Sequence, residues 1–494
     1  MKIISSVSVK GGVAGQIGGM EKSVPVYERL AGVLGGMIES RSLRAGDRMP
    51  SVRHFSSQHR VSVPTALRAY VTLETRGLIE ARPKSGFYVR ARRADLTPEP
   101  VKKSATPKIT ALRNEDPAAF LFADLTNSKL VPFGAALPSA HLLPGIKLTR
   151  TMAAIGRRLG ADSISYDASP GSAALRRELA RRSLDWGCAL QADDFLITIG
   201  GTEALSLALR AVCKPGDTVV VEAPTYFGLT SILRELKLKA LAVPVDSSDG
   251  IDLESLEKTL RKNRVTACVV IPNVHNPIGF VMPEERKRRL IEICAARGVA
   301  VIEDDTYADL QYEGPRPRCL KAFGDDSVIL CGSYSKKLAP GYRIGYVAGA
   351  KWQARILALK QASTLNGPLL PALAVAEFLK NGGYDRYVRS VRQEYRNQVE
   401  QMREAIAESF PKGVRLSRPK GGYLLWCEMP GQVDALKLFK QAREAGISIA
   451  PGPLFSPTGD FRNYVRINCG HPWSSAIERA IGVLGHLVKR QCGG

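Results

Sequence analysis

The sequence lacks the cysteine patterns typical of disulfide-rich and zinc-binding proteins. Its nine cysteines are an odd number, none lies before Cys188, and no two are separated by only two residues. A disulfide framework needs cysteines that pair, and the common zinc sites need closely spaced ones. We therefore expect reduced thiols in a reducing compartment and no metal site.

Long hydrophobic runs are also missing. The 494 residues contain no apolar run of 18 residues and no signal-peptide core followed by a cleavage site. We therefore expect a cytoplasmic protein that does not interact with membranes. The first 19 residues are rich in Gly, Ser and Val and lack apolar periodicity, which predicts a disordered arm over residues 1–24, or a true start at Met20.

Acidic residues are scarce between residues 41 and 93. This segment contains twelve Arg and Lys but only three Asp and Glu, in a chain with a formal net charge of +23. A local excess of positive charge attracts polyanions, including nucleic acids. The alternative is a small α/β domain with an incidentally basic surface.

Residues 25–91 predict a winged helix-turn-helix domain. Apolar residues recur at helical spacing from Val26, and two serines precede a short helix and a longer helix over 63–76. The segments "LIEAR" and "FYVRA" then predict a hairpin. In such a domain the second helix enters the major groove and basic side chains hold phosphates. The candidate DNA-binding residues are Arg48, Ser51, Arg53, Ser62, Thr65, Arg68, Lys84, Ser85 and Gly86.

Two motifs make this segment resemble the DNA-binding domain of GntR-family regulators, "GDRMPSVR" and "PKSGFYV". The chain departs from the family at Val63-Pro64, where Arg-Thr is common, so the resemblance leaves base readout and the operator open. Residues 92–115 are polar and contain three prolines, which predicts a linker.

The remaining residues, 116–494, predict an α/β domain. Short apolar strands such as "DTVVVEAP", "ACVVIPN" and "VAVIEDD" alternate with helical segments, which is typical of a mostly parallel sheet. Ligands of such sheets bind at the carboxyl ends of the strands. Candidate binding residues follow these strands: Gly201, Thr202, Tyr226, Asn276, Asp304, Tyr307, Ser333, Ser335, Lys336 and Arg343.

Together these residues fit pyridoxal 5'-phosphate (PLP). A carboxylate, Asp304, keeps a pyridine nitrogen protonated, and an aromatic ring, Tyr226, stacks on the pyridine. A lysine amine forms a Schiff base with the aldehyde. Asn276 and Tyr307 suit the phenolic oxygen, and Thr202, Ser333 and Arg343 suit the phosphate. Taken singly, Gly201-Thr202 could be a turn, Asp304 a capping carboxylate, and 331–346 a basic surface loop.

Six motifs make residues 115–490 resemble a fold-type I, class I/II aminotransferase: "YDASPGSAALRRELA", "GGTEALSLALRA", "PTYFG", "HNPIG", "EDDTY" and "SYSKKLAPGYRIGY". The resemblance implies a PLP-dependent transferase fold, with a large domain and a smaller α+β C-terminal domain. It also implies that Lys336, not Lys337, is the catalytic lysine. Tyr166 would reach the phosphate across a dimer interface, and Arg466 in "NYVRINCG" would bind a substrate carboxylate.

The combination of both resemblances is the layout of the MocR-type subfamily of GntR regulators. It implies a transcriptional regulator that binds a double-stranded DNA operator as a head-to-tail homodimer. Its aminotransferase-like domain would sense PLP, or an amino acid or amine effector. The alternatives are an active class I/II aminotransferase with an accessory N-terminal domain, and a basic protein that binds nucleic acid without sequence preference.

Overall fold

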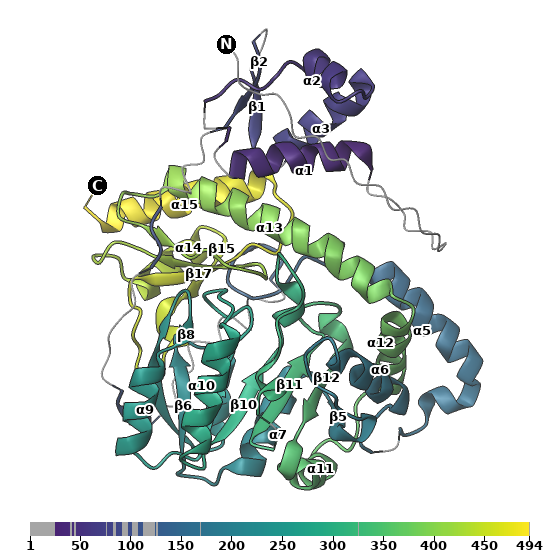
Figure 1. The fold of residues 1–494 in the computed structure, drawn as a ribbon. Coiled ribbons are helices and arrows are strands. Elements are labelled where there is room, and N and C mark those ends of the chain that lie inside the picture. The colour runs from purple at the N-terminus through teal and green to yellow at the C-terminus, as the bar shows by residue number, and fades with distance from the viewer. Residues whose placement is uncertain are drawn as a thin grey trace. The chain divides into compact units, whose positions relative to one another are not determined.

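The computed structural model divides the chain into two compact units, Met1–Arg92 and Arg93–Gly494. It describes residues 25–39, 42–43, 46–75, 77–82, 85–90, 97–100, 107–111, 124, 127–167, 169–324 and 326–493. The predicted disordered arm, residues 1–24, and the predicted DNA contact Lys84 lie outside this range. We describe each unit separately (Figure 1).

The first unit consists of three helices and a hairpin, in the order α1, α2, α3, β1 and β2. Two predicted N-caps stabilise the helix starts, because Ser51 Oγ accepts from His54 N at 3.2 Å and Ser62 Oγ accepts from Thr65 N at 3.3 Å. The strands pair antiparallel, with Ile79 opposite Val89. The bounds are α1 Val26–Glu39, α2 Val52–Gln58, α3 Val63–Thr75, β1 Ile79–Arg82 and β2 Gly86–Val89.

The core of this unit determines which side of α3 faces outward. Ala66, Ala69, Tyr70 and Leu73 recur at helical spacing along α3, and all four are fully buried. The Tyr70 hydroxyl donates to the carbonyl oxygen of Pro50 at 2.8 Å, which ties α3 to the segment before α2. The opposite face of α3 is consequently presented to solvent.

The second unit is built on a sheet in the order β3-β7-β6-β9-β10-β11-β12-β5, with β8 paired to β7, over the described residues. The central strands β7, β6, β9, β10 and β11 run parallel, and β12 is antiparallel to both of its neighbours. The strands are β3 Ile109–Ala111, β5 Phe195–Thr198, β6 Thr218–Ala223, β7 Lys239–Asp246, β8 Gly250–Ile251, β9 Ala267–Val270, β10 Ala300–Asp304, β11 Val328–Ser333 and β12 Gly345–Ala348.

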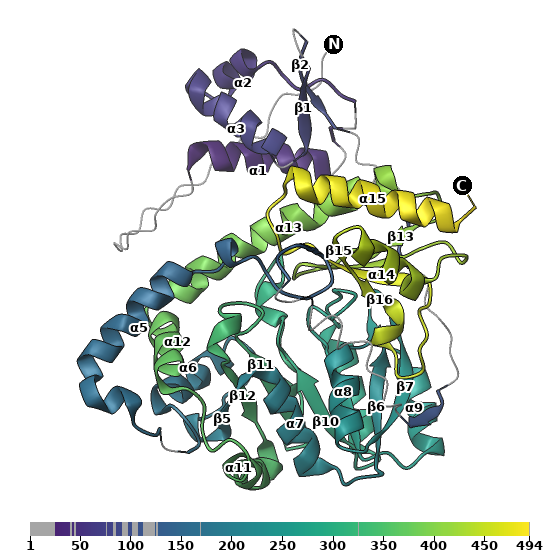
Figure 2. The same cartoon turned by 180° about the vertical axis from the view of Figure 1, so that it is seen from behind.

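Helices cover both faces of this sheet, as Figures 1 and 2 show from opposite sides. Alternate residues of one strand enter different clusters: Val219 and Val221 pack with α7 and α8, and Val220 packs with α9 and α10. Strands buried on both faces explain the continuous apolar runs of the sequence. The helices are α5 Gly145–Leu159, α6 Ala173–Ser183, α7 Gly200–Val212, α8 Phe227–Glu235, α9 Leu253–Lys262, α10 Glu284–Ala295, α11 Gln353–Gln361 and α12 Leu369–Lys380.

The C-terminal part of this unit forms a smaller α+β layer. A sheet in the order β13-β14-β17-β16 packs its apolar side against α13, α14 and α15, and β15 pairs with β4. The bounds are β4 Val131–Pro132, α13 Gly383–Ser409, β13 Arg415–Leu416, β14 Leu424–Glu428, α14 Ala435–Glu444, β15 Ile447–Ser448, β16 Ala450–Pro451, β17 Tyr464–Asn468 and α15 Ser475–Gln491.

The expected linker, residues 92–115, contributes to the second unit where it is described. Strand β3 pairs antiparallel with β7 at the edge of the sheet, and the carbonyl oxygen of Pro98 accepts from Leu416 N at 2.9 Å. A three-residue strand between prolines and polar residues leaves no periodicity in the sequence, so only the pairing reveals it.

The nine cysteines are free thiols. Across the residues that the structure describes, no helix combines the length and hydropathy needed to span a bilayer. Within the same ranges, no three His, Cys, Asp or Glu side chains gather as a metal site would require.

Candidate functional site

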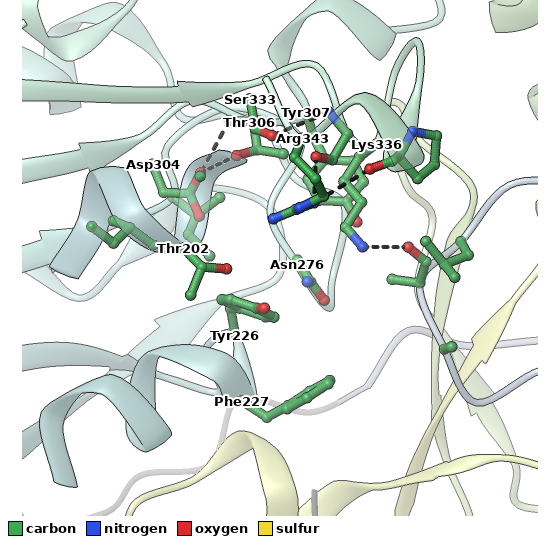
Figure 3. Close-up of a pocket in the computed structure, with 18 residues that line it drawn as sticks. Thr202, Tyr226, Phe227, Asn276, Asp304, Thr306, Tyr307, Ser333, Lys336 and Arg343 are labelled. Carbon is green, nitrogen blue, oxygen red and sulfur yellow. Dashed lines mark hydrogen bonds between the residues drawn. The ribbon is translucent and has the colours of Figure 1, made fainter. Parts of the chain in front are cut away.

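A cavity of about 300 Å³ opens at the carboxyl ends of the parallel strands. β10 ends at Asp304 and β11 at Ser333, while α7 begins beside them at Gly200 (Figure 3). Such a position is the usual ligand site of a parallel α/β sheet. The cavity is lined by the ten predicted residues Gly201, Thr202, Tyr226, Asn276, Asp304, Tyr307, Ser333, Ser335, Lys336 and Arg343.

The two adjacent lysines point in different directions. The Nζ atom of Lys336 lies at the cavity and donates to the carbonyl oxygen of Ala136 at 2.8 Å. Burial, together with the charges of Arg466 and Arg343, lowers the pKa of Lys336 to about 8. Lys337 is fully buried and forms an ion pair with Asp309. Only the amine of Lys336 is therefore available to a ligand in the cavity.

Asp304, the last residue of β10, lines the cavity. Its Oδ1 atom accepts from the backbone N of Thr306 at 3.1 Å and from the Thr306 hydroxyl at 2.5 Å. Burial raises the pKa of Asp304, and the two bonds from Thr306 oppose this rise because they favour the ionised carboxylate. A protonated pyridine nitrogen would supply the positive charge that the buried Asp304 requires.

Tyr307 and Asn276 offer polar atoms on another side of the cavity. The Tyr307 hydroxyl is buried and makes no hydrogen bond to any residue in the described ranges, and burial raises its pKa. A buried hydroxyl without an acceptor costs free energy unless a ligand supplies one. Tyr226 lies nearby with its ring toward the cavity, as Figure 3 shows, and burial raises its pKa as well.

Two glycines let the start of α7 approach Arg343 and Ser333. Gly200 has φ +77°, and a Cβ atom on it would lie 2.4 Å from Arg343 Nη2. A Cβ on Gly201 would lie 3.2 Å from the Cβ of Ser333. Arg343 Nη1 donates to Ser335 Oγ at 2.9 Å, so the guanidinium is held beside the helix N-terminus. Backbone N–H groups, hydroxyls and an arginine at a helix start suit a phosphate.

Arg466 and Tyr166 do not line the cavity themselves, although Arg466 contacts one of its lining residues, Asn276. Arg466 on β17 is fully buried, and its guanidinium donates to Asn276 Oδ1 at 3.2 Å and to the carbonyl oxygen of Gly134. Burial lowers the pKa of Arg466 to about 10, and its Nε atom makes no hydrogen bond within the described residues. The Tyr166 side chain is 90% exposed. Arg466 is therefore covered by its own chain, whereas Tyr166 faces solvent.

Sequence reasoning missed several residues that line the cavity. Thr306 and Phe227 lie inside the quoted motifs "EDDTY" and "PTYFG", so both were within reach of the sequence. Ala135, Ala136 and Leu137 come from a segment about 200 residues before Lys336 and show no motif. These residues contribute through the position of their backbone, and no pattern in the sequence indicates that position.

The predicted DNA-binding residues that the structure describes belong to the segment before α2, to α2 and α3 with their N-caps, and to the hairpin of the first unit. Arg48 bridges to Tyr88, and Ser85 Oγ lies 2.7 Å from the Tyr88 hydroxyl beside Gly86, whose φ is +104°. Ser51 and Ser62 cap helices, and the hydroxyls of Ser62 and Thr65 lie 2.7 Å apart. Arg53 is exposed on α2.

Arg68 on α3 is exposed, but its guanidinium lies over the ring of Tyr27 at 4.3 Å from the centroid. This cation–π contact connects α3 to α1. The contact occupies the face of the guanidinium and leaves its in-plane N–H donors available.

Comparison with known proteins assigns a family to each unit. Residues 26–89 match the bacterial regulatory proteins of the gntR family, and residues 146–484 match aminotransferase class I and II. The uncharacterized HTH-type transcriptional regulator YjiR of Escherichia coli (strain K12) is 37% identical, over 94% of this chain and 99% of that protein. This chain is a GntR-family transcriptional regulator of the MocR type.

The second unit of this regulator is similar to working aminotransferases. The 2-aminoadipate transaminase of Thermus thermophilus is 32% identical, over 73% of this chain and 90% of that protein. The crystal structure of LysN, an alpha-aminoadipate aminotransferase from Thermus thermophilus, superposes with a TM-score of 0.71 at 30% identity, over 76% of this chain and 95% of that one. That structure is complexed with N-(5'-phosphopyridoxyl)-L-leucine.

The class I/II aminotransferase fold implies PLP as the cofactor of this regulator. The cavity fits it, because it offers a lysine amine with a lowered pKa, a buried carboxylate and an arginine at a helix start. The buried Tyr307 hydroxyl, which lacks a hydrogen bond to the described residues, would gain an acceptor in the phenolic oxygen.

Proposed function

We propose that this regulator couples the state of its PLP pocket to operator affinity. The observation that carries the proposal is the placement of Lys336, whose amine faces the cavity with a pKa of about 8 while Lys337 pairs with Asp309. PLP, when bound, supplies an aldehyde carbon that reacts with amines and a ring that withdraws electrons. Lys336 would hold that aldehyde, and Asp304 and Arg343 would orient the ring and the phosphate.

The effector is PLP itself, or an amino acid or amine held beside it. Arg466 supports a carboxylate-bearing effector, because its Nε atom has no hydrogen bond within the described residues and its guanidinium contacts Asn276 at the cavity. Arginine suits a carboxylate because it can bind both oxygens at once. Since Arg466 is covered by its own chain, an effector carboxylate has to displace the carbonyl oxygen of Gly134 or the Asn276 side chain.

Coupling requires that the ligand bind two arrangements of the protein unequally. We infer that the arrangement is that of a head-to-tail homodimer in the cytoplasm, where the operator DNA lies. The exposed Tyr166 supports the dimer, because an aromatic side chain that is 90% exposed beside the exposed Ile164 is typical of a surface that another chain covers. Tyr166 would then reach the phosphate of the partner subunit's PLP.

The test is binding of the full-length protein to the DNA upstream of its own and neighbouring genes, at fixed salt, with and without PLP. We expect specific binding whose affinity changes with PLP in the wild type and not in Lys336→Ala. Lys351→Ala, which replaces an exposed lysine of the same unit, is the control and should respond like the wild type. An equal PLP response in Lys336→Ala would contradict the proposal.

A transaminase is the second candidate, and the similarity to a 2-aminoadipate transaminase favours it. Ten of the eleven residues predicted to bind the cofactor line the cavity, and the exception is the exposed Tyr166. A steady-state assay with amino donors and 2-oxo acids separates the two candidates. Robust turnover without specific DNA binding would favour the enzyme.

A further inference from the structure

The outward face of α3 is apolar where a DNA-reading helix is usually polar. Val63 is 46% exposed and Leu67 is 45% exposed, one helical turn apart at the N-terminal end of the helix. Pro64 lies beside them and is also exposed. Val71, four residues beyond Leu67, is also 46% exposed. Large apolar side chains are normally buried, so three of them along the outer face of a helix indicate a surface that contacts something.

The polar side chains of the same helix start already have partners within the unit. The hydroxyls of Ser62 and Thr65 lie 2.7 Å apart, and Ser62 also caps the helix. The guanidinium of Arg68 lies over the Tyr27 ring. These contacts use part of the hydrogen-bonding capacity of the helix start and orient its polar side chains. Val63 and Leu67 add an apolar surface beside them.

The surroundings of this face favour DNA over a second protein surface. Arg53 on α2 and Arg60 in the turn before α3 are exposed. Two acids of the unit are engaged locally: Glu80 on β1 pairs with Arg82 at 2.9 Å, and Glu74 near the end of α3 accepts from Ala81 N at 2.9 Å. Exposed arginines on the segments before an apolar helix face match a duplex, whose phosphates flank a groove that displays apolar methyl groups.

We propose that Val63 and Leu67 read thymine 5-methyl groups in the major groove of the operator. This inference rests on the proposed operator recognition and adds the chemistry by which bases are selected. The thymine methyl is the one apolar group that a base pair displays in the major groove, and aliphatic side chains recognise it by contact. The two side chains are about 6 Å apart along the helix axis, which corresponds to thymines one or two base-pair steps apart.

The test replaces thymine by uracil, which removes the methyl group and leaves the hydrogen-bonding edge unchanged. Duplexes that the full-length protein retains from a random pool define its preferred sequence. Each thymine of that sequence is then replaced singly by deoxyuridine, and the Kd is measured at fixed salt. We expect a loss of about fourfold at one or two positions in each half-site, which is the effect of burying a single methyl group.

Variants identify the side chains responsible. Leu67→Ala should bind the thymine and deoxyuridine duplexes equally at one of those positions, and Val63→Ala at another. Both residues are exposed and alanine favours the helix, so the fold should be retained. Val33→Ala on α1, at a side chain that is 55% exposed, is the matched control and should discriminate like the wild type.

If a preferred sequence is obtained but uracil replaces thymine at every position without loss of affinity, the inference is overturned and operator recognition stays intact. Failure to obtain any preferred sequence would instead overturn operator recognition, and the inference with it. A change in oligomeric state in Leu67→Ala, without a change in discrimination, would assign the apolar face to a second copy of the chain and contradict our proposal.

Discussion

At the scale of single residues, Lys336 is distinguished from Lys337 by its surroundings. The ordinary pKa of lysine leaves about one amine in three thousand neutral at pH 7, whereas a pKa of about 8 leaves roughly one in ten neutral. Lys337 cannot take the role of Lys336, because its buried side chain forms an ion pair with Asp309. Two adjacent residues with the same side chain thus serve different purposes.

A pH dependence follows from this difference. The neutral amine is the form that attacks an aldehyde, so the rate of PLP capture by the apo protein should rise through pH 7 to 8 and level off above about pH 9. The sign follows from the lowered pKa, because deprotonation is complete at a lower pH than for an ordinary lysine. Stopped-flow absorbance of added PLP measures the rate. A rate that continues to rise up to about pH 10.5 would contradict the lowered pKa.

Gly200 allows a second prediction. Gly200→Ala places a Cβ against Arg343, in a backbone conformation that L side chains rarely adopt. We expect PLP affinity to fall by about tenfold, because the displaced guanidinium loses its position for the phosphate. Gly216→Ala is the control: its φ is +91°, but nothing lies within 4 Å of the added Cβ. Fluorescence titration with PLP compares the two variants, and equal losses would show that Arg343 is not involved.

At the scale of elements, the caps and the core orient α3. The Ser62 hydroxyl satisfies the backbone N–H of Thr65, and the buried side of the helix is anchored through Tyr70 and Pro50. These local contacts decide which residues of the helix remain outside. The apolar outer face consequently belongs to a helix whose orientation is well determined within its unit.

Removal of the cap should weaken this unit. Ser62→Ala leaves the first N–H groups of α3 without their side-chain acceptor and should reduce the free energy of unfolding by about 1 kcal/mol. Circular dichroism during urea denaturation measures the change. Ser57→Ala, at an exposed position within α2, should change it by much less. An unchanged free energy of unfolding in Ser62→Ala would contradict this prediction and indicate that water satisfies the N–H group that the cap had bound.

At the scale of the whole molecule, the chain combines two units with separate cores. Only the second unit contains the PLP cavity. A ligand that binds one folded unit stabilises that unit by mass action. The structure therefore predicts how heat should affect the protein.

We expect two calorimetric transitions, of which PLP raises only the larger. At a PLP concentration of about 100 times Kd the second unit gains about 2.7 kcal/mol, while the first should shift little. Lys336→Ala should reduce the shift of the larger transition, and operator DNA should raise the smaller one. A single transition that shifts as a whole with PLP would show that the units unfold together.

The sequence alone determined much of this protein, because several of its signals are local. Ser51 and Ser62 as caps, and the strand ends at Asp304 and Ser333, depend on neighbouring residues and were predicted correctly. Ten of the residues that line the cavity were likewise singled out, since most of them stand at or after a strand end or at a helix start.

Only the tertiary structure decided the rest, because those features depend on residues far apart in the chain. Spacing could not separate Lys336 from Lys337, and the resemblance alone chose between them, whereas the structure shows Lys337 turned toward Asp309. Ala136 meets Lys336 across 200 residues through a backbone carbonyl that any residue could supply. The cover over Arg466 and the pairing of β3 arise in the same way, from packing between segments that no local pattern connects.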